Sequence, residues 1–372
     1  MRSSYVAARA GVGLLLLVAG GCKKDSDTGA SATLPAYIKF VQPNLYPEGT
    51  QYDSQSGRFL VSSETTGSIG QVTGDIAATD TTNTGTYTIF ADNDQLISTI
   101  GLNLDASRNR LLAAVSDPGY NKDRTKDATK NKLAATAIFD RSTGTLMDFI
   151  NLSAVSPSTY TAHFANDIAI DAQGNAYVTD SYAPIIYKIA FAGGKGTASV
   201  WLSSSALSAP AGKFGLNGIV YHPSGYLLVA KSDEGKLLKI PVTTVPGSTA
   251  AATTTVPGTL TTVALPAGLD LSGDDGLQLL DNTNLLVVCN AQGKVYKVTT
   301  ADDFGSVTTT GTNNVATGGT SPYPTTLARR TASGPGISTA VSASYVLYSH
   351  LNALQASQNP PVTTFRIQKL SL

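Results

Sequence analysis

Phe164–Asp180 has the sequence FANDIAIDAQGNAYVTD. Apolar and small residues alternate after Asn166, an Asp-x-x-Gly turn begins at Asp171, and the β-favouring run 177–179 follows. An alternating pattern, a turn rich in Asp and Gly, and a second run of aromatic and β-branched residues are typical of a β-hairpin. This stretch is therefore predicted to form two antiparallel strands.

The same pattern recurs along the chain. Six related segments begin at Glu48, Ile100, Asn166, Asn217, Asp275 and, more weakly, Thr325. Their first residues lie 52, 66, 51, 58 and 50 residues apart, and candidates for a third strand follow at 185–189, 236–240 and 294–298. Several strands recurring at roughly 40 to 50 residues are typical of propeller blades. We predict an all-β fold, a six-bladed β-propeller. A β-sandwich or two unrelated β-domains would explain the strand density, but not a hairpin repeated six times.

The N-terminus resembles the signal peptide of a bacterial lipoprotein. Residues 1–21 contain early arginines, the apolar run 12–18 and the small residues 19–21, and Cys22 follows. The apolar run is too short to span a bilayer as a mature helix. The resemblance implies cleavage before Cys22, lipidation of Cys22 and anchoring to a bacterial membrane in the cell envelope, on its periplasmic or its surface side. One position departs from the lipobox, because Ala19 stands where Leu is usual. Plain secretion with an incidental cysteine is the alternative.

Composition sets the domain organisation. Residues 22–35 are small and polar, so we expect a tether, and residues 36–372 are left for the propeller. We expect the protein to be a monomer.

The charges of the chain balance, with 26 basic and 26 acidic residues. This balance gives no indication of nucleic-acid binding. Cys289 lies in an apolar run, so a buried small residue is expected there rather than a reactive thiol.

Two segments have the character of insertions. Residues 117–132 carry many charges, and we expect a solvated loop; a lid over the channel mouth is the alternative. Residues 245–265 are rich in Thr, Ala, Pro and Gly, and we expect them to connect outer strands.

The first residues of the repeats carry the expected chemistry. In a propeller the innermost strands surround a central channel, so equivalent residues form a ring. Four of the six have a carboxylate or amide oxygen, and we predict them as metal ligands: Glu48, Asn166, Asn217 and Asp275. Two carboxylates and two amides suit calcium best; magnesium, manganese and zinc stay open. Ile100 and Thr325 would leave their side of the ring open for a ligand. The alternative is that Asn, Asp and Glu only make turns at the starts of strands.

At these positions the chain resembles the regucalcin, gluconolactonase and luciferin-regenerating-enzyme family of six-bladed propellers. Pro47-Glu48-Gly49 matches a motif of its first blade, and the pairs at 166–167, 217–218 and 275–276 match motifs of later blades. The resemblance implies metal-dependent hydrolysis of a lactone or ester, with the metal polarising the carbonyl. It points to Asp275 as the base, with Asp274 as a second candidate.

Substrate contacts are expected next to the ring. We assign this role to His163, Phe164, Asp167 and Thr325. Sugar-lactone members of the family have Arg at the position of Phe164, so a less polar substrate than a polyhydroxylated lactone is indicated. The sequence contains no Gly-x-Ser-x-Gly, His-Glu-x-x-His, Cys-x-x-Cys or Walker-type motif.

Two functions therefore stay open. The first is a calcium-dependent hydrolase of lactones or related esters, anchored in the cell envelope. The second is a propeller that binds a ligand or a protein at its channel face without turnover, because the same fold serves both roles.

Overall fold

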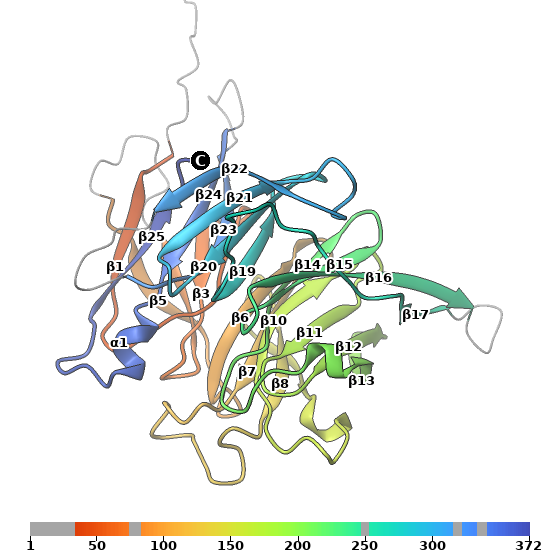
Figure 1. Cartoon of the computed structure of the whole chain (residues 1–372). Coiled ribbons are helices and arrows are strands. Elements are labelled where there is room, and N and C mark those ends of the chain that lie inside the picture. Colours follow the sequence, from red (N-terminus) through yellow and green to blue (C-terminus); the bar gives the residue numbers. More distant parts are fainter. Residues whose placement is uncertain (1–33, 74–82, 247–252, 315–321, 333–340) are drawn as a thin grey trace, which may run out of the picture.

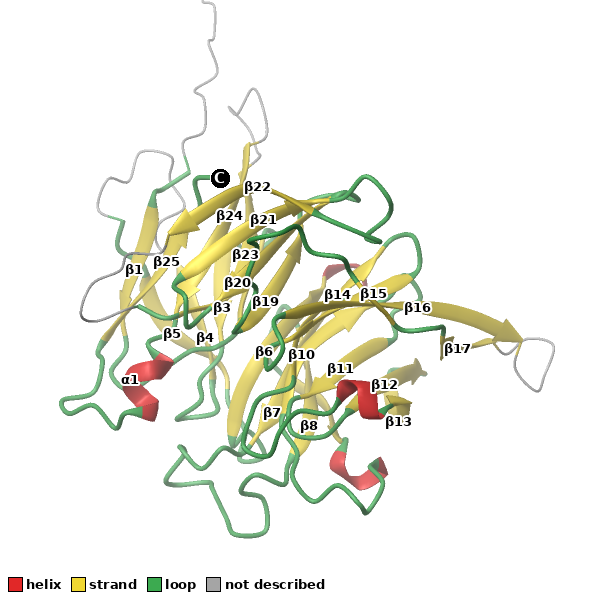
Figure 2. Ribbon diagram, in the orientation of Figure 1, coloured by secondary structure: helices red, strands yellow, loops and turns green. Residues whose placement is uncertain are grey.

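The described residues form six sheets arranged as the blades of a propeller (Figures 1 and 2). The computed structural model describes residues 34–73, 83–246, 253–314, 322–332 and 341–372. The prediction of an all-β, six-bladed propeller is confirmed. The predicted signal peptide, the lipidation site Cys22 and the tether up to residue 33 lie outside the described residues. No helix in the described part of the chain is both long enough and apolar enough to cross a membrane.

Five blades take their strands in sequence order from the channel outward. The first has β2 (Thr50–Asp53), β3 (Arg58–Val61), β4 (Ile69–Thr73) and β5 (Thr86–Ala91). The second has β6 (Ser98–Asp105), β7 (Arg110–Ser116), β8 (Ala134–Asp140) and β9 (Leu146–Asn151). The third has β10 (Ala165–Ile170), β11 (Ala176–Asp180), β12 (Ile185–Ala192) and β13 (Lys195–Ser203). The fourth has β14 (Leu216–His222), β15 (Tyr226–Lys231) and β16 (Lys236–Pro246), with β17 (Thr253–Pro257) and β18 (Thr261–Thr262) both paired to β16. The fifth has β19 (Asp274–Leu279), β20 (Asn284–Cys289), β21 (Lys294–Thr299) and β22 (Thr308–Asn314).

The sixth blade joins the two ends of the chain. It contains β23 (Pro324–Ala332), β24 (Val341–Tyr348), β25 (Thr364–Lys369) and, outermost, β1 (Tyr37–Val41). β1 pairs antiparallel with β25, and Figure 1 shows these early and late segments side by side. Pro35 adds a contact, since its carbonyl accepts a hydrogen bond from the Tyr345 hydroxyl at 2.7 Å. The ring is thus closed by backbone hydrogen bonds, a feature that the sequence analysis did not predict.

Burial explains the apolar runs of the sequence. Every residue of β3, β7, β11 and β15 is buried, because these second strands are covered by neighbouring blades on both faces. The outer strand β13 instead alternates between exposed and less exposed residues. Short helices lie in the connections: η1 (Ala106–Arg108), η2 (Ser153–Val155), η3 (Ser205–Leu207) and α1 (Leu351–Gln355).

The innermost strands pack backbone against backbone around the channel. A Cβ added to Gly218 would lie 2.2 Å from the Asp275 carbonyl oxygen, and one added to Gly49 would lie 2.3 Å from that of Ile100. Such distances are too short for any side chain. Each of these glycines directly follows a ring residue and lies against the ring residue of the next blade, which explains the recurring Gly at this place.

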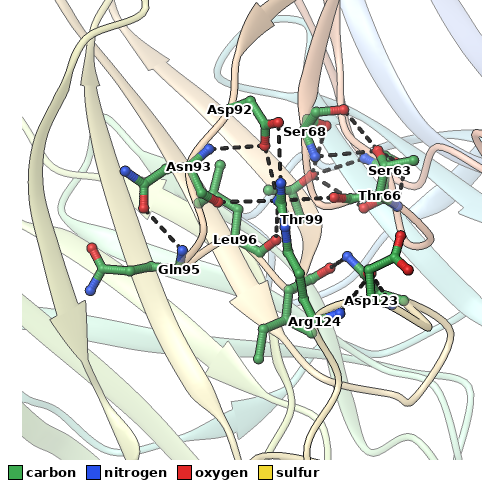
Figure 3. Close-up of polar contacts among 12 residues, drawn as sticks. Ser63, Thr66, Ser68, Asp92, Asn93, Gln95, Leu96, Thr99, Asp123 and Arg124 are labelled. Atoms are coloured by element: carbon green, nitrogen blue, oxygen red, sulfur yellow. Dashed lines mark hydrogen bonds and ion pairs between the residues drawn. The ribbon is translucent and has the colours of Figure 1, made fainter.

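The two predicted insertions have defined structure. Arg124 anchors the segment 117–132 to the connection between the first two blades, donating to the carbonyls of Thr66 at 3.1 Å and Leu96 at 2.9 Å and pairing with Asp92 at 2.9 Å (Figure 3). Its other charged side chains at 122, 123, 126, 127, 130 and 132 are exposed, as expected for a solvated loop, while Arg124 fixes the loop to the fold. The run 245–265 contributes β17 and β18 to the fourth blade, so it supplies outer strands as well as connecting them.

Candidate active site

β-Bulges direct the ring residues toward the channel axis. The pairing of β10 with β11 shifts between Ala165 and Ile168, so Asn166 and Asp167 form the bulge. Equivalent shifts in β6, β14, β19 and β23 contain Ile100, Asn217, Asp275 and Thr325. A bulge interrupts the ladder and re-aims the side chain of the extra residue. Five of the six repeats thus carry a bulge, whereas Glu48 lies just before β2, which pairs with β3 without a shift.

A cavity of about 460 Å³ lies where these bulges meet. All four predicted metal ligands line it: Glu48, Asn166, Asn217 and Asp275. They come from four different blades. The structure therefore brings together the side chains that the sequence analysis selected, and their role as metal ligands remains a prediction.

Three oxygens at this cavity have no hydrogen-bond partner among the described residues. They are Oε2 of Glu48, Oδ1 of Asn166 and Oδ1 of Asn217, and all three are buried. Buried polar atoms are almost always paired, so these three acceptors are available to a bound water, a donor group or a cation. Carboxylate and amide oxygens are the donors that calcium prefers. The residues present therefore fit a hard divalent cation.

Neutral side chains form hydrogen bonds with two of the four predicted ligands. The Asn217 amide Nδ2 lies 3.1 Å from Ser232 Oγ, and Asn290 Nδ2 donates to Asp275 Oδ2 at 3.0 Å. In the described part of the chain, no group of three or more His, Cys, Asp or Glu side chains is placed to hold a metal. Any cation at this cavity would therefore depend on the amide oxygens of Asn166 and Asn217 as well as on carboxylates.

The cavity carboxylates have raised pKa values. Burial raises the pKa of Glu48 well above its usual value, and the nearby Asp275, Asp167 and Glu64 raise it further. Burial raises the pKa of Asp275 to about 8, with a further contribution from Asp167, although hydrogen bonds from Asn290 and Asn217 oppose the shift. The described residues form no ion pair with these carboxyl groups. A bound cation would supply the missing compensation and lower these pKa values.

Glu64 belongs to the cavity, and the sequence analysis missed it. Glu64 lines the cavity, and burial raises its pKa to about 8, with Asp275 adding to the shift. It follows β3, so it comes from the second strand of its blade and not from the first. A polar residue recurs at the ends of the second strands, as at Ser116, Ser181, Ser232 and Asn290, but its counterpart in the first blade is Ser62 and not Glu64, so this repeat did not select Glu64.

These recurring residues also hold the ring. Ser116 Oγ donates to the carbonyl of Ala165 at 3.0 Å, and Ser181 Oγ donates to that of Leu216 at 2.6 Å. Both carbonyls belong to the residue just before a predicted ligand. Each blade therefore fixes the backbone from which the next blade presents its cavity side chain.

Three residues of the predicted site lie elsewhere. Asp274 is fully buried outside the lining of the cavity, and burial raises its pKa well above its usual value. Thr325 is also fully buried, and its hydroxyl donates to the Glu48 carbonyl at 2.8 Å across the closure of the ring. His163 is buried beside the cavity wall, where Nδ1 lies 2.7 Å from Asp180 Oδ2 and Nε2 lies 3.1 Å from the Tyr160 carbonyl. These contacts orient neighbouring groups rather than a ligand.

Phe164 and Asp167 lie on different sides of the ring residue Asn166. Phe164 lines the cavity. Asp167 lines a second hollow of about 260 Å³ formed by the inner strands, and its carboxylate accepts a hydrogen bond from the Ile219 amide at 3.3 Å. Burial raises the pKa of Asp167 to about 7. Asp167 therefore acts on the cavity through its charge and not as part of its lining.

Comparison with known proteins supports the fold. No protein-family model matches the chain, and no curated protein matches its sequence. Among solved structures, the major allergen Mala s 1 of Malassezia sympodialis superposes with a TM-score of 0.66 at 18% identity, covering 91% of this chain and 97% of that protein. A luciferin-regenerating enzyme has a TM-score of 0.52 at 14% identity, with 89% and 93% covered. A calcium-binding regucalcin of Agrobacterium tumefaciens has a TM-score of 0.50 at 15% identity, with 89% and 95% covered. This chain shares the six-bladed propeller fold of these proteins.

Proposed function

We propose that the chain is a divalent-metal-dependent hydrolase of lactones or related esters, with calcium as the best-suited metal. The observation that carries the proposal is the group of three orphaned buried oxygens, from Glu48, Asn166 and Asn217, in the cavity that Asp275 also lines. Proteins with the same fold include a luciferin-regenerating enzyme and a calcium-binding regucalcin, which is consistent with this proposal.

The chain's own residues have separable roles. Glu48, Asn166, Asn217 and Asp275 would hold the cation, which when bound polarises the substrate carbonyl and stabilises the oxyanion. In the reaction the oxygen of water bonds to the acyl carbon, the acyl C–O bond breaks, and a proton passes from the water to the leaving alkoxide. Asp275 and Glu64 both line the cavity, so each is placed to take up and return that proton. Asp274 is not, because it lies outside the cavity lining.

Charge-neutralising variants test the proposal. Glu48→Gln and Asp275→Asn should weaken calcium binding and lower hydrolysis of a lactone panel by at least about a hundredfold, since each removes a charged ligand. Asp281→Asn is the matched control, because Asp281 is exposed on a turn and accepts hydrogen bonds from Thr283 and Asn284. Calcium binding is measured by titration calorimetry, and hydrolysis with and without chelator.

The outcomes separate the two functions. Hydrolysis that survives both cavity substitutions would show that the site is wrongly assigned. A protein that binds calcium through Glu48 and Asp275 but cleaves no lactone or ester would support the second function, a propeller that binds its ligand without turnover.

The cell-envelope location is a separate proposal and rests on the sequence alone. A chain anchored through Cys22 should sediment with membranes and incorporate a labelled fatty acid. Cys22→Ser should abolish both. Sedimentation of the variant with membranes would contradict lipid anchoring at this residue.

A further inference from the structure

One wall of the cavity consists of three aromatic rings that pack on each other. We call Phe164, Tyr182 and Phe214 the aromatic wall; all three line the cavity. Their ring centroids are 5.4 Å apart for Phe164 and Tyr182, 5.2 Å for Phe164 and Phe214, and 5.3 Å for Tyr182 and Phe214. These are distances of favourable aromatic contact. Phe164 is buried under the others, whereas Phe214 keeps 37% of its surface exposed at the mouth.

The buried carboxylate of Asp180 holds the backbone that carries two of these rings. Asp180 Oδ1 accepts hydrogen bonds from the backbone amides of Phe164 at 2.9 Å and Tyr182 at 3.0 Å. Its Oδ2 lies 2.7 Å from His163 Nδ1 and accepts from the Tyr187 hydroxyl at 3.1 Å. His163, predicted to contact substrate, thus belongs to the support of the wall. A wall held by this network is preformed, so ligand binding does not have to order it.

The loop that carries Phe214 is also tied down. The Gly215 amide donates to the Ser181 carbonyl at 2.9 Å, and the buried Lys231 ammonium donates to the Ser208 carbonyl at 2.9 Å. Ser181 directly follows Asp180. The two segments that build the wall are therefore joined to each other by hydrogen bonds.

Other apolar and aromatic residues also line the cavity. They are Pro118, Tyr120, Tyr323 and Leu351, next to the polar residues Glu64, Asn290 and Gln355. Pro118 and Tyr120 belong to the loop that Arg124 anchors, so their part of the lining is also fixed. The cationic side chain in the lining is that of Lys213, which is exposed. A ligand reaching the predicted ligands therefore meets the aromatic wall and the rings of Tyr120 and Tyr323, which suit contact with an alkyl chain or an aryl ring.

We propose that the site selects lactones or esters that carry an apolar substituent, and that the aromatic wall determines this selectivity. The substituent packs on Phe164, Tyr182 and Phe214 while the carbonyl group lies at the part of the cavity where Glu48 and Asp275 would hold the cation. This inference rests on the proposed hydrolase function for its catalytic part, but the predicted ligand preference does not require turnover.

Binding of inert analogues tests the preference without catalysis. The probes are a six-membered lactam with a pentyl substituent and a polyhydroxylated lactam of the same ring size, titrated against the calcium-loaded protein by calorimetry. We expect the pentyl lactam to bind at least tenfold more tightly. Phe214→Ala should weaken pentyl-lactam binding about tenfold and leave the polyhydroxylated lactam within twofold, because only the former contacts the wall. Phe214→Leu, which keeps apolar bulk, should restore most of the affinity.

Turnover provides the second readout. For the corresponding lactones, Phe214→Ala should lower kcat/KM about ten- to a hundredfold on the pentyl-substituted lactone and within twofold on the unsubstituted ring. Ile89→Ala is the matched control: Ile89 is 60% exposed on the outer strand β5, and its loss should change neither readout.

Each outcome has a distinct meaning. Tighter binding of the polyhydroxylated lactam, or equal loss of both probes in Phe214→Ala, would overturn the inference while leaving the hydrolase proposal intact. Selective pentyl-lactam binding with no lactone turnover would refute the hydrolase proposal and retain the ligand preference.

Discussion

Acidic side chains at the two ends of the innermost strands differ in their partners: those at the cavity end lack a cationic partner, and those at the other end pair with arginines. Glu48 lies just before β2 and has an unpaired buried oxygen in the cavity. Asp53 ends the same strand, is fully buried, and pairs with Arg58 and Arg141. Asp105, at the end of β6, likewise pairs with Arg110. The chain therefore has arginines available for buried carboxylates, and it places them at the end away from the cavity.

The pKa values follow this division. Burial acts to raise the pKa of Asp53, but the hydrogen bond and the charge of Arg141 outweigh it, and the pKa of Asp53 is lowered. Burial raises the pKa of Asp275 to about 8, where no arginine opposes it. Arg141 belongs to the second blade and Asp53 to the first, so the paired end also joins blades. One end of the strands contributes stability, and the other keeps carboxyl groups that have no cationic partner among the described residues and that a ligand can use.

Removing the arginine that pairs with Asp53 should cause the largest loss of stability. Arg141→Met leaves Asp53 buried with its charge only partly compensated, which we expect to lower the free energy of unfolding by about 3–5 kcal/mol. Urea denaturation measures the change. Asp53→Asn in the same background should recover part of the loss. Calcium affinity should be unchanged, and a fall in affinity as large as that in stability would contradict the division between the two ends.

Calcium binding at the unpaired end should release protons. Below about pH 8 Asp275 holds a proton in the metal-free chain, and the pKa of Glu48 is also raised, so calcium must displace protons to bind. Affinity should therefore rise about tenfold per pH unit for each displaced proton up to about pH 8 and level off above it. Calorimetry in buffers of different ionisation enthalpy counts the protons. Affinity that is flat between pH 6 and 8 would contradict protonation of these carboxyl groups in the metal-free chain.

Removing the Glu64 charge should stabilise the metal-free protein. Because the folded-state pKa is raised to about 8, the folded chain keeps a proton that the unfolded chain has released, and stability falls as pH rises toward 8. Glu64→Gln should flatten this slope and raise Tm at pH 8.5 by roughly 2–5 °C, with little change at pH 4.

Glu234 offers a control of opposite sign. Hydrogen bonds from Lys231 and Lys236 lower the pKa of Glu234 to about 2, so its charge is favourable in the folded state. Glu234→Gln should lower Tm slightly at pH 8.5. A rise in Tm in both variants would indicate a general effect of reduced negative charge and not a property of the cavity.

The smallest change in stability and calcium affinity is expected when a neutral side chain that supports the backbone of a predicted ligand is removed. Ser62 Oγ accepts hydrogen bonds from the backbone amides of Glu48 at 3.1 Å and Gly49 at 2.7 Å. Ser62→Ala should cost about 1 kcal/mol of stability and weaken calcium binding a few-fold, because the backbone carrying Glu48 loses its support. Thermal unfolding and calorimetry test the two parts. Unchanged calcium affinity would show that Ser62 only stabilises the fold.

Local sequence patterns were sufficient to predict the blades and the four proposed metal ligands that line the cavity. The hairpin at Phe164–Asp180 and its repeats predicted the inner strands, because a period of two and an Asp-Gly turn specify a hairpin without reference to the rest of the chain. The repeat also selected Glu48, Asn166, Asn217 and Asp275, since equivalent positions in equivalent blades must face the same axis. Phe164, selected through the family resemblance, also lines the cavity, and its contact with substrate remains a prediction.

Contacts between blades decided the remainder. The pairing of β1 with β25, the role of Glu64, and the turning of Thr325 toward the Glu48 carbonyl all join segments far apart in sequence. Adjacent residues such as Asp274 and Asp275 also differ in fate, because a bulge directs one to the cavity and leaves the other in the interior. The sequence by itself determined which residues recur at the axis, because periodicity is local. Only the tertiary structure decided which of them stay without partners, because a buried oxygen is satisfied or orphaned by neighbours that folding alone brings close.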